Sequence, residues 1–397
     1  MRTILHCDLN NFFASVECLV NPSLRNLPVA VCGNVEERRG IVLAKNDLAK
    51  AMGVSTAEPI WQAKQKCRDL VVVPPTFHLY EEYSRRTYEI YTRFTDNIEA
   101  FGIDECWLDV SGSTRLFGSG EEIAFKIKET VKAELGLRIS VGVSFNKIFA
   151  KLGSDMKKPD AVTVIPVEGF KEKIWSLPCS DMLGVGRVTN SKLKRYSINT
   201  IGELANTDVD FLARLLGVNG IGIWKFANGL DSSPVAHQTF RREIKSVGNS
   251  TTCIVDLTDN EQVWKVMLRL SQMVSERLRA SNLSANGVQI TVKTPDLCYN
   301  EFQMQLSSPV RTSIQLCIAG FELFKLNFKW EKDVRAIGIR AISLSSSSIE
   351  RQLNLLEDNK KIERLEKLEE VSDSLKKRFG RDIVFPLALK NEVYTRI

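Results

Sequence analysis

Apolar positions along this chain recur with two different spacings, and the spacing predicts the type of each element. Short apolar runs bounded by turn residues predict strands at 4 to 7, 28 to 32, 40 to 44, 137 to 143, 161 to 165, 244 to 254, 287 to 293, 301 to 306 and 334 to 343. A spacing of three to four residues, typical of one face of a helix, predicts helices at 45 to 52, 79 to 97, 120 to 134, 146 to 156, 261 to 279 and 311 to 324.

The order of these elements predicts an α+β multidomain protein. The strands up to residue 165, including a strand-turn-strand around Asp104, would form an antiparallel or mixed sheet backed by helices, a ferredoxin-like layer with a small α/β insertion. Residues 182 to 205 and 212 to 229 each read as a pair of helices with a glycine-containing turn. After a polar linker at 231 to 243, the order βαββαβ predicts a second unit.

Composition is that of a folded, multidomain protein. The 397 residues suggest roughly two to four domains, and 44% hydrophobic with 26% charged residues is typical of a folded chain in water. No apolar stretch approaches the ~20 residues that span a bilayer, and the N-terminus lacks a signal peptide's apolar region, so we expect a cytoplasmic protein without membrane contact. Nine cysteines without a Cys-x-x-Cys pair, and three histidines without zinc spacing, favour reduced thiols.

Three carboxylates stand at strand ends or bends: Asp8 directly after the first strand, and the neighbours Asp104 and Glu105. Ionised together they repel one another, and a bound cation is the simplest remedy. Oxygen ligands without histidine or cysteine select Mg²⁺ or Mn²⁺, and two such ions about 3.5 to 4 Å apart support nucleotidyl transfer. The alternative is a solvated hairpin with acidic residues at its turn. Asp109 is expected to face water or to pair with a lysine.

Lysines and glycines offer further candidate contacts. Lys50 and Lys158 lie at helix ends, where an ammonium group can reach a phosphate, although a solvated charge is the commoner reason for such a lysine. The turn containing Gly184 and Gly186 resembles a helix-hairpin-helix, whose amides hold a DNA phosphate; an ordinary tight turn fits the same residues.

Six motifs follow one another over nearly the whole chain: H-C-D-L-N-N-F-F-A-S-V-E, N-D-L-A-K-A-M-G-V, I-D-E-C-W-L-D-V-S-G, G-V-S-F-N-K-I-F-A-K-L-G-S-D-M-K-K-P, M-L-G-V-G and K-S-V-G. In this order and spacing they resemble the Y family of lesion-bypass DNA polymerases, nearest its DNA polymerase IV branch. The resemblance implies a right-hand polymerase with a ferredoxin-like palm (1 to 11 and 76 to 165), small fingers (12 to 75), a helical thumb with a helix-hairpin-helix (166 to 234), a βαββαβ little finger (240 to 346) and a C-terminal tail (347 to 397).

The resemblance also implies the site residues. Asp8, Asp104 and Glu105 would hold two Mg²⁺ ions, with Mn²⁺ as the alternative, and the backbone carbonyl of Leu9 would complete one ion's ligands. Phe13 falls at the steric-gate position, where an aromatic ring leaves no room for a 2′-hydroxyl; an ordinary core aromatic is the alternative. The nucleotide-binding positions of the family fall on Asn10, Asn11, Phe12, Phe13, Lys50 and Lys158.

Three features depart from the family pattern. Asp47-Leu48-Ala49-Lys50 stands where many relatives carry Tyr-x-x-Arg, so an acid replaces the tyrosine and a point charge replaces the guanidinium. Gly102 stands where serine is common, and Ile41 and Leu43 are bulky for the fingers' roof over the incoming base. These departures leave the lesion preference open. They do not change the expectation that the chain polymerises DNA.

Contacts with primer-template DNA would come from the thumb, through Gly184 and Gly186, and from the little finger, through Lys245 and Ser246. A net charge of +6 is by itself weak evidence for nucleic acid. Residues 238 to 346, however, hold 14 Lys and Arg against 10 Asp and Glu, so a surplus of four positive charges lies in the predicted little finger.

The tail begins with a serine run at 345 to 348, expected to be a flexible linker, and includes a charged amphipathic helix at 360 to 379. Between them stands a peptide similar to the family's sliding-clamp motif, with the expected contacts Gln352, Leu353, Leu355 and Leu356. The start of the tail helix is the alternative interpretation.

The resemblance implies a translesion DNA polymerase that transfers dNMP units from dNTP to a primer 3′-hydroxyl, as a monomer associated with the nucleoid. Because the four domains and the tail account for the 397 residues, we expect no proofreading exonuclease. Two alternatives stay open: a nucleotide cyclase, whose ferredoxin-like core also uses paired metals and a triphosphate, and a non-catalytic scaffold bound to DNA and the clamp.

Overall fold

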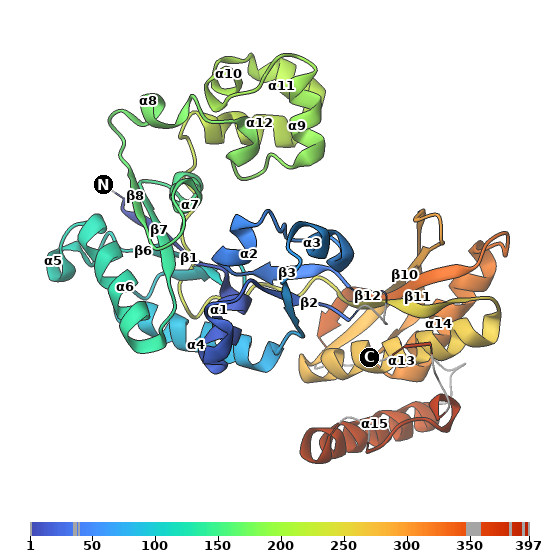
Figure 1. The fold of residues 1–397 in the computed structure, drawn as a ribbon. Helices are drawn as coiled ribbons and strands as arrows, with labels where there is room; N and C mark the ends of the chain where they lie inside the picture. Colours follow the sequence, from blue (N-terminus) through green and yellow to red (C-terminus); the bar gives the residue numbers. More distant parts are fainter. Residues whose placement is uncertain are drawn as a thin grey trace. The chain divides into compact units, whose positions relative to one another are not determined.

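A computed structural model describes residues 2 to 34, 38, 40 to 346, 359 to 380, 383 to 390, 394 and 395 (Figure 1). The chain divides into two compact units. The first comprises Met1–Gly33 and Ile41–Arg241, and the second comprises Asn34–Gly40 and Arg242–Ile397. None of the helices in the described residues combines the length and apolarity needed to cross a bilayer.

A five-stranded mixed sheet forms the centre of the first unit. Its strands lie in the order β5 (Ile98–Ala100), β6 (Glu105–Asp109), β1 (Ile4–Leu9), β7 (Ile139–Ser144) and β8 (Val162–Ile165). β7 and β8 are parallel, and the other neighbours are antiparallel. The predicted mixed sheet and the strand-turn-strand around Asp104 are thereby confirmed.

Alternation along β1 decides which side chains face which helix. Leu5, Cys7 and Leu9 join the main apolar core, to which α6 (Gly120–Leu135) contributes its buried face. His6 points to the other side, where it hydrogen-bonds with Ser154 of α7 (Lys147–Met156). Asp8 lies two residues on and therefore faces the α7 side as well.

Gly142 in β7 allows α7 to pack this closely on the sheet. A Cβ atom at this position would lie 1.9 Å from the carbonyl oxygen of Ala150 and 2.5 Å from the amide nitrogen of Ser154, both in α7. Only a residue without a side chain fits between the strand and the helix.

A second, three-stranded sheet has the order β3-β2-β4. β2 (Val29–Cys32) and β3 (Val42–Lys45), which match the strands predicted at 28 to 32 and 40 to 44, pair antiparallel, and β4 (Val71–Val73) adds in parallel. Both β4 and the helix α3 were absent from the predicted elements. The helices and turns beside the two sheets are α1 (Phe12–Val20), η1 (Pro22–Leu24), α2 (Asp47–Ala51), α3 (Ile60–Lys66), α4 (Phe77–Tyr91) and α5 (Thr114–Phe117).

Residues 170 to 227 form a group of short helices with an apolar core that Leu193, Leu204 and Leu212 share with α7 residues. The elements are α8 (Phe170–Ile174), η2 (Cys179–Asp181), α9 (Arg187–Lys194), α10 (Ile201–Asn206), α11 (Val209–Leu216) and α12 (Val218–Ala227). The turn with Gly184 and Gly186 precedes α9 and follows η2, so the element before it is a single 3₁₀ turn.

The second unit has the predicted order βαββαβ: β9 (Val247–Leu257), α13 (Asn260–Ala280), β10 (Leu283–Lys293), β11 (Tyr299–Val310), α14 (Ser313–Asn327) and β12 (Val334–Ser346). Its strands lie in the antiparallel order β11-β10-β12-β9. α13 and α14 pack against each other and against this sheet. β12 continues through Ser345 and Ser346, so the predicted serine linker is wrong for these two residues.

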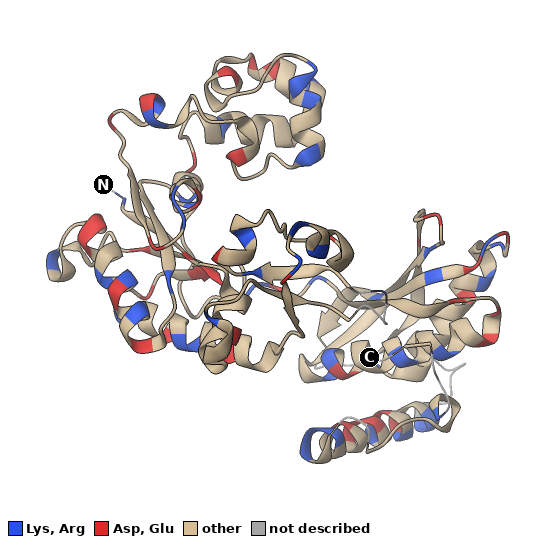
Figure 2. Ribbon diagram, viewed as in Figure 1, with Lys and Arg blue, Asp and Glu red and all other residues tan. Residues whose placement is uncertain are grey.

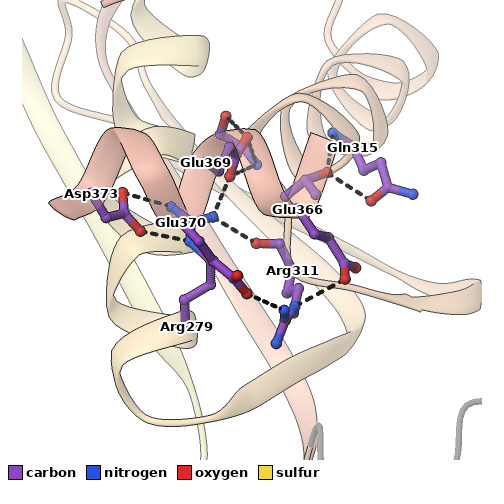
Figure 3. Close-up of polar contacts among 9 residues, drawn as sticks. Arg279, Arg311, Gln315, Glu366, Glu369, Glu370 and Asp373 are labelled. Atoms are coloured by element: carbon purple, nitrogen blue, oxygen red, sulfur yellow. Dashed lines mark hydrogen bonds and ion pairs between the residues drawn. The ribbon is translucent and has the colours of Figure 1, made fainter. Parts of the chain in front are cut away.

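The described part of the tail belongs to the second unit. α15 (Asn359–Phe379) carries alternating acidic and basic side chains (Figure 2). Asp373 accepts two hydrogen bonds from Arg279, at 2.7 and 3.0 Å, and Glu369 pairs with the same guanidinium (Figure 3). Glu366 and Glu370 pair with Arg311 at 3.3 and 2.6 Å. Further along, Leu389 in η3 (Leu387–Leu389) is buried in this unit's core.

Candidate active site

Asp8 and Glu105 lie directly opposite each other on the neighbouring antiparallel strands β1 and β6. Opposite residues of an antiparallel pair project on the same face, so both carboxylates lie on the α7 side of the sheet. Asp104 lies just before β6, in the turn, and its carbonyl oxygen accepts a hydrogen bond from the Leu9 amide at 3.0 Å. The two adjacent acids are thereby separated, one in the ladder and one in the turn.

Two lysines pair with Asp8 and Glu105. Lys158 Nζ lies 2.7 Å from Asp8 Oδ2 and 2.9 Å from Asp155 Oδ1. Lys151 Nζ lies 2.8 Å from Glu105 Oε1 and 3.6 Å from Asp8 Oδ2. Lys151 was not among the predicted residues. Lys151 lies one helical turn before Asp155 on α7, at 3.4 Å from its carboxylate, and Asp155 also pairs with Lys158 just beyond the helix end; this i,i+4 spacing is the signal that could have suggested it.

Burial sets the ionisation of the three acids. Removal from water raises the pKa of Asp8 to about 6, although Lys158 partly offsets this effect. Burial and the neighbouring Glu105 charge also raise the pKa of Asp104. Burial opposes the charge on Glu105 too, but His6, whose Nε2 lies 3.5 Å from the carboxylate, and the Lys151 ammonium group outweigh it and hold the pKa of Glu105 at about 2. Asp8, Glu105 and Asp155 share two lysines, so the carboxylates here outnumber the ammonium groups that pair with them.

Among the described residues, no three acidic, histidine or cysteine side chains are arranged as a closed metal-ligand set. The donors that this face does present are carboxylate oxygens, which suit a hard divalent cation. Asp109, at the far end of β6, is separate from them. Its carboxylate accepts hydrogen bonds from Ser111 and lies 4.0 Å from Arg2, so it pairs with an arginine and not with the expected lysine.

Phe13 lies at the start of α1, partly exposed, and is supported by other aromatic rings. Its ring stacks on Tyr80 with 4.2 Å between centroids and 9° between planes, and Phe77 meets it edge-on at 6.1 Å. Tyr80 is fully buried; its hydroxyl donates to Glu17 at 2.5 Å and accepts from the Thr76 amide at 3.0 Å. The ring behind Phe13 is therefore fixed in place, and Tyr80 was not predicted.

The turn between β1 and α1 is held from several sides. The Asn10 side chain is buried, donates to Ser140 Oγ at 3.0 Å and accepts from the Asp160 amide at 2.8 Å. Asn11 is left-handed, with φ of 52°. Phe12 is 3% exposed and belongs to the core. The side chains of Asn10 and Phe12 are thus engaged inside the protein.

The remaining predicted residues lie elsewhere. Lys50 is exposed near the end of α2. Gly184 has φ of +92°, a conformation that glycine adopts readily, and Gly186 caps the N-terminus of α9. Lys245 and Ser246 are exposed directly before β9. The clamp-like peptide with Gln352, Leu353, Leu355 and Leu356 lies outside the described residues.

The open face of the β9–β12 sheet is hollowed. Its lining includes small residues, which leave the strands accessible, and two cations beside one acid: Gly248, Ser250, Gly338, Lys293, Arg340 and Glu301. A neighbouring hollow includes Ser246 and Arg277. Accessible backbone and positive charge on one surface are features that suit a phosphate backbone.

Comparisons with known proteins identify the family. Residues 7–155 match the impB/mucB/samB family, and residues 244–355 match the C-terminal domain of the same family. The chain is 51% identical to DNA polymerase IV of Acetivibrio thermocellus over 96% of this chain and 95% of the relative, and 37% identical to DNA polymerase IV 1 of Bacillus subtilis over 96% and 92%.

A solved structure shares the fold. It is a Y-family DNA polymerase chimera of Dbh and Dpo4, with a TM-score of 0.77 and 24% identity, covering 87% of this chain and 99% of the chimera. The fold is therefore the right-hand polymerase fold that the motifs predicted. Two matched family regions, relatives that align over almost their whole length, and this shared architecture show that the chain belongs to the Y family of DNA polymerases, in its DNA polymerase IV branch.

Proposed function

We propose that this chain is a translesion DNA polymerase, in which a primer 3′-hydroxyl attacks the α-phosphate of a bound dNTP and pyrophosphate leaves. The observation that carries the proposal is the Asp8–Glu105 pair on the central strands, with Asp104 in the adjoining turn and two lysines against the carboxylates. The relatives named DNA polymerase IV support the same activity. A cyclase or a non-catalytic scaffold gains no support from them.

The donor set fits a hard divalent cation, because it consists of carboxylate oxygens that outnumber the two lysines paired with them. Asp8, Asp104, Glu105 and the Leu9 carbonyl would hold two Mg²⁺ ions, or Mn²⁺ in their place. When bound, the ions would lower the pKa of the attacking hydroxyl and stabilise the leaving pyrophosphate. The chain's own part is to fix the carboxylates on two hydrogen-bonded strands, so that little reorganisation is needed.

The residues around this pair would select and hold the nucleotide. Lys158, which now lies 2.7 Å from Asp8, would turn to the triphosphate as its counter-charge, and Lys50 would add a second cation. Phe13, supported by Tyr80, would contact the sugar and exclude a 2′-hydroxyl. The backbone of residues 10 to 13 would line the same space.

DNA would be held mainly through its phosphates. We assign the palm, fingers, thumb and little finger to the ranges that the motifs implied, with Gly184 and Gly186 on one phosphate backbone and Lys245 and Ser246 on the other. The hollowed, cationic sheet face supports this role for the little finger. Such contacts are independent of sequence and weaken as salt rises.

We also propose that the chain works as a monomer and binds a sliding clamp through Gln352 to Leu356. A pull-down with purified clamp tests the contact, and substitution of Leu353 and Leu355 by alanine should remove it.

Primer extension with purified protein tests the main proposal. Asp8→Asn should abolish extension while DNA affinity stays within about two-fold, because a neutral amide cannot replace a metal-binding carboxylate. Asp109→Asn is the matched control, since it neutralises a carboxylate at the far end of β6. DNA binding without extension by the unmodified chain would favour the scaffold, and a cyclic product from nucleotide alone would favour the cyclase.

A further inference from the structure

Asp47 departs from the family's motif, and the structure shows what this acid contacts. It is the first residue of α2, and its two carboxylate oxygens have different partners. Asn11 Nδ2 donates to Asp47 Oδ1 at 2.7 Å, and Arg138 Nη2 donates to Asp47 Oδ2 at 2.5 Å. Arg138 is 91 residues from Asp47 in the sequence, yet it lies beside this motif, in which Lys50 stands where many relatives carry arginine.

Arg138 is also fixed to the turn that carries the candidate site. Its carbonyl oxygen accepts a hydrogen bond from the Asn10 amide at 2.8 Å, two residues after Asp8. The next residue, Ile139, pairs with Leu9 in the β1–β7 ladder. The guanidinium thus lies between the turn at Asn10 and Asn11 and the start of α2. It offers five N–H donors, and its side chain is 40% exposed, so donors remain for a ligand.

The surroundings of Asp47 carry excess positive charge. Lys45 and Lys50 are close enough that their repulsion, together with burial of Lys45, lowers the pKa of Lys45. Burial opposes the charge on Asp47, but the hydrogen bonds from Arg138 and Asn11 hold its pKa below the usual range, so Asp47 is ionised near neutral pH. A second acid, Glu58, is paired with Lys66 at 2.5 Å. Four cations against two carboxylates leave a net charge of about +2, which favours a polyanion.

We propose that Arg138 binds the phosphate tail of the incoming dNTP and that Asp47 is the positioning residue that orients its guanidinium. This inference rests on the proposed function and names a residue for it that lies outside the family's motif. Arginine suits the role because its planar fork can donate two parallel hydrogen bonds to a phosphate. The Asp47–Arg138 pair would then replace, from a different strand, the grip that the Tyr-x-x-Arg motif supplies in relatives.

The competing explanation is that the ion pair only connects α2 to β7. Steady-state kinetics distinguishes a phosphate-binding role of Arg138 from a purely structural one. A contact made equally to bound substrate and transition state raises KM for the nucleotide and leaves kcat unchanged. A purely structural pair changes the melting temperature and leaves the KM for dNTP unchanged.

The test compares Arg138→Gln, Arg138→Lys, Asp47→Asn and the double variant Arg138→Gln/Asp47→Asn in primer extension. Loss of a charge-assisted hydrogen bond should raise the KM for dNTP about ten-fold or more in Arg138→Gln, with kcat and DNA affinity within about two-fold. Arg138→Lys should recover part of the loss. Asp47→Asn should raise KM less, and should add nothing in the Arg138→Gln background, because it acts through the same guanidinium.

The matched control is Arg93→Gln. Arg93 is exposed and pairs with Glu134 at 2.5 and 2.8 Å in the same unit, away from the carboxylate site. An Arg138→Gln variant with the same KM as Arg93→Gln would overturn the proposal, whatever its melting temperature.

Nucleotide binding separates failure of this inference from failure of the proposed function. Titration of the unmodified chain and Arg138→Gln with dATP and with dAMP, in Mg²⁺, needs no turnover. If Arg138 binds the phosphate tail, the variant loses affinity for dATP and keeps its affinity for dAMP. An unchanged ratio of the two affinities would refute the role of Arg138 even if the chain extends primers, and a chain that fails to extend would refute the proposed function alone.

Discussion

At the scale of single residues, sugar selection should depend on Tyr80 as well as on Phe13. The Phe13 ring lies flat against Tyr80, which is fixed by hydrogen bonds to Glu17 and Thr76. Phe13→Val should raise ribonucleotide incorporation strongly because it opens the space that the ring fills. Tyr80→Ala should raise it as well, by removing the support. Primer extension with matched rNTP and dNTP measures both effects.

Tyr80→Phe keeps the ring and loses the hydrogen bonds to Glu17 and Thr76. It separates the support that the ring gives from the support that its hydroxyl gives, and a smaller increase in ribonucleotide incorporation than in Tyr80→Ala is expected for it. If Phe13→Val discriminates as well as the unmodified chain, Phe13 is an ordinary core aromatic.

The sequence alone allowed part of the candidate site to be predicted residue by residue. Asp8, Asp104, Glu105, Phe13 and Lys158 could be named because each lies in a motif with a characteristic order. Tyr80 and Arg138 could not, since they lie outside the six motifs and their partners are remote: Glu17 is 63 residues from Tyr80, and Asp47 is 91 residues from Arg138. Lys151 lies inside a motif and was not singled out. A charged side chain at a helix or strand end has the same local pattern whether it contacts water, an ion pair or a substrate.

At the scale of elements, α15 should be held to the second unit by its acidic face. The Arg279 side chain is only 7% exposed, so loss of Asp373 leaves a buried charge that Glu369 alone compensates. Asp373→Asn should destabilise this unit by about 3 kcal/mol, measured by urea unfolding. Glu363→Gln, at an exposed position of the same helix, should have an effect below about 0.5 kcal/mol. Equal stability of the two variants would mean that the ion pairs contribute no net stability.

Gly142 sets the distance between α7 and the central sheet. Gly142→Ala places a methyl group where the backbone of α7 now lies, so the helix and its lysines must move. We expect a loss of stability of about 1 to 3 kcal/mol or more and a large loss of extension activity. Gly112→Ala should be tolerated and serves as the control, because an added Cβ there would meet no atom within 4 Å beyond the neighbouring residues of the chain. Thermal unfolding and primer extension give the two measurements.

Prediction of the elements succeeded where periodicity was long and failed where elements were short. The amphipathic helices α6, α7 and α13 were predicted within two residues of their observed ends. β4, with three residues, and α3, with seven, were not predicted, because short segments carry too little periodic signal. The predicted helix at 79 to 97 ends at Tyr91, and the buried Phe94 lies in the turn that leads to β5.

At the scale of the whole molecule, the boundary between the two compact units should be sensitive to proteolysis. One of the places where the chain passes from the first unit to the second lies between Arg241 and Arg242, which are exposed and outside regular structure. Brief trypsin treatment should cut there before it cuts inside either unit, because the backbone within the sheets is protected. Mass spectrometry of the early fragments checks this. Early cleavage within 98 to 165 would show that the first unit is less stable than its packing implies.

The two lysines at the carboxylate pair have a thermodynamic consequence. The Lys158 ammonium group that lies against Asp8 cannot at the same moment lie against a triphosphate. Any cation that takes over Asp8 therefore sets Lys158 free for the nucleotide, and a nucleotide that captures Lys158 leaves Asp8 open to the cation. The two ligands would bind with positive cooperativity, and linkage requires each to strengthen the other by the same factor. The site would then discriminate against either ligand arriving alone.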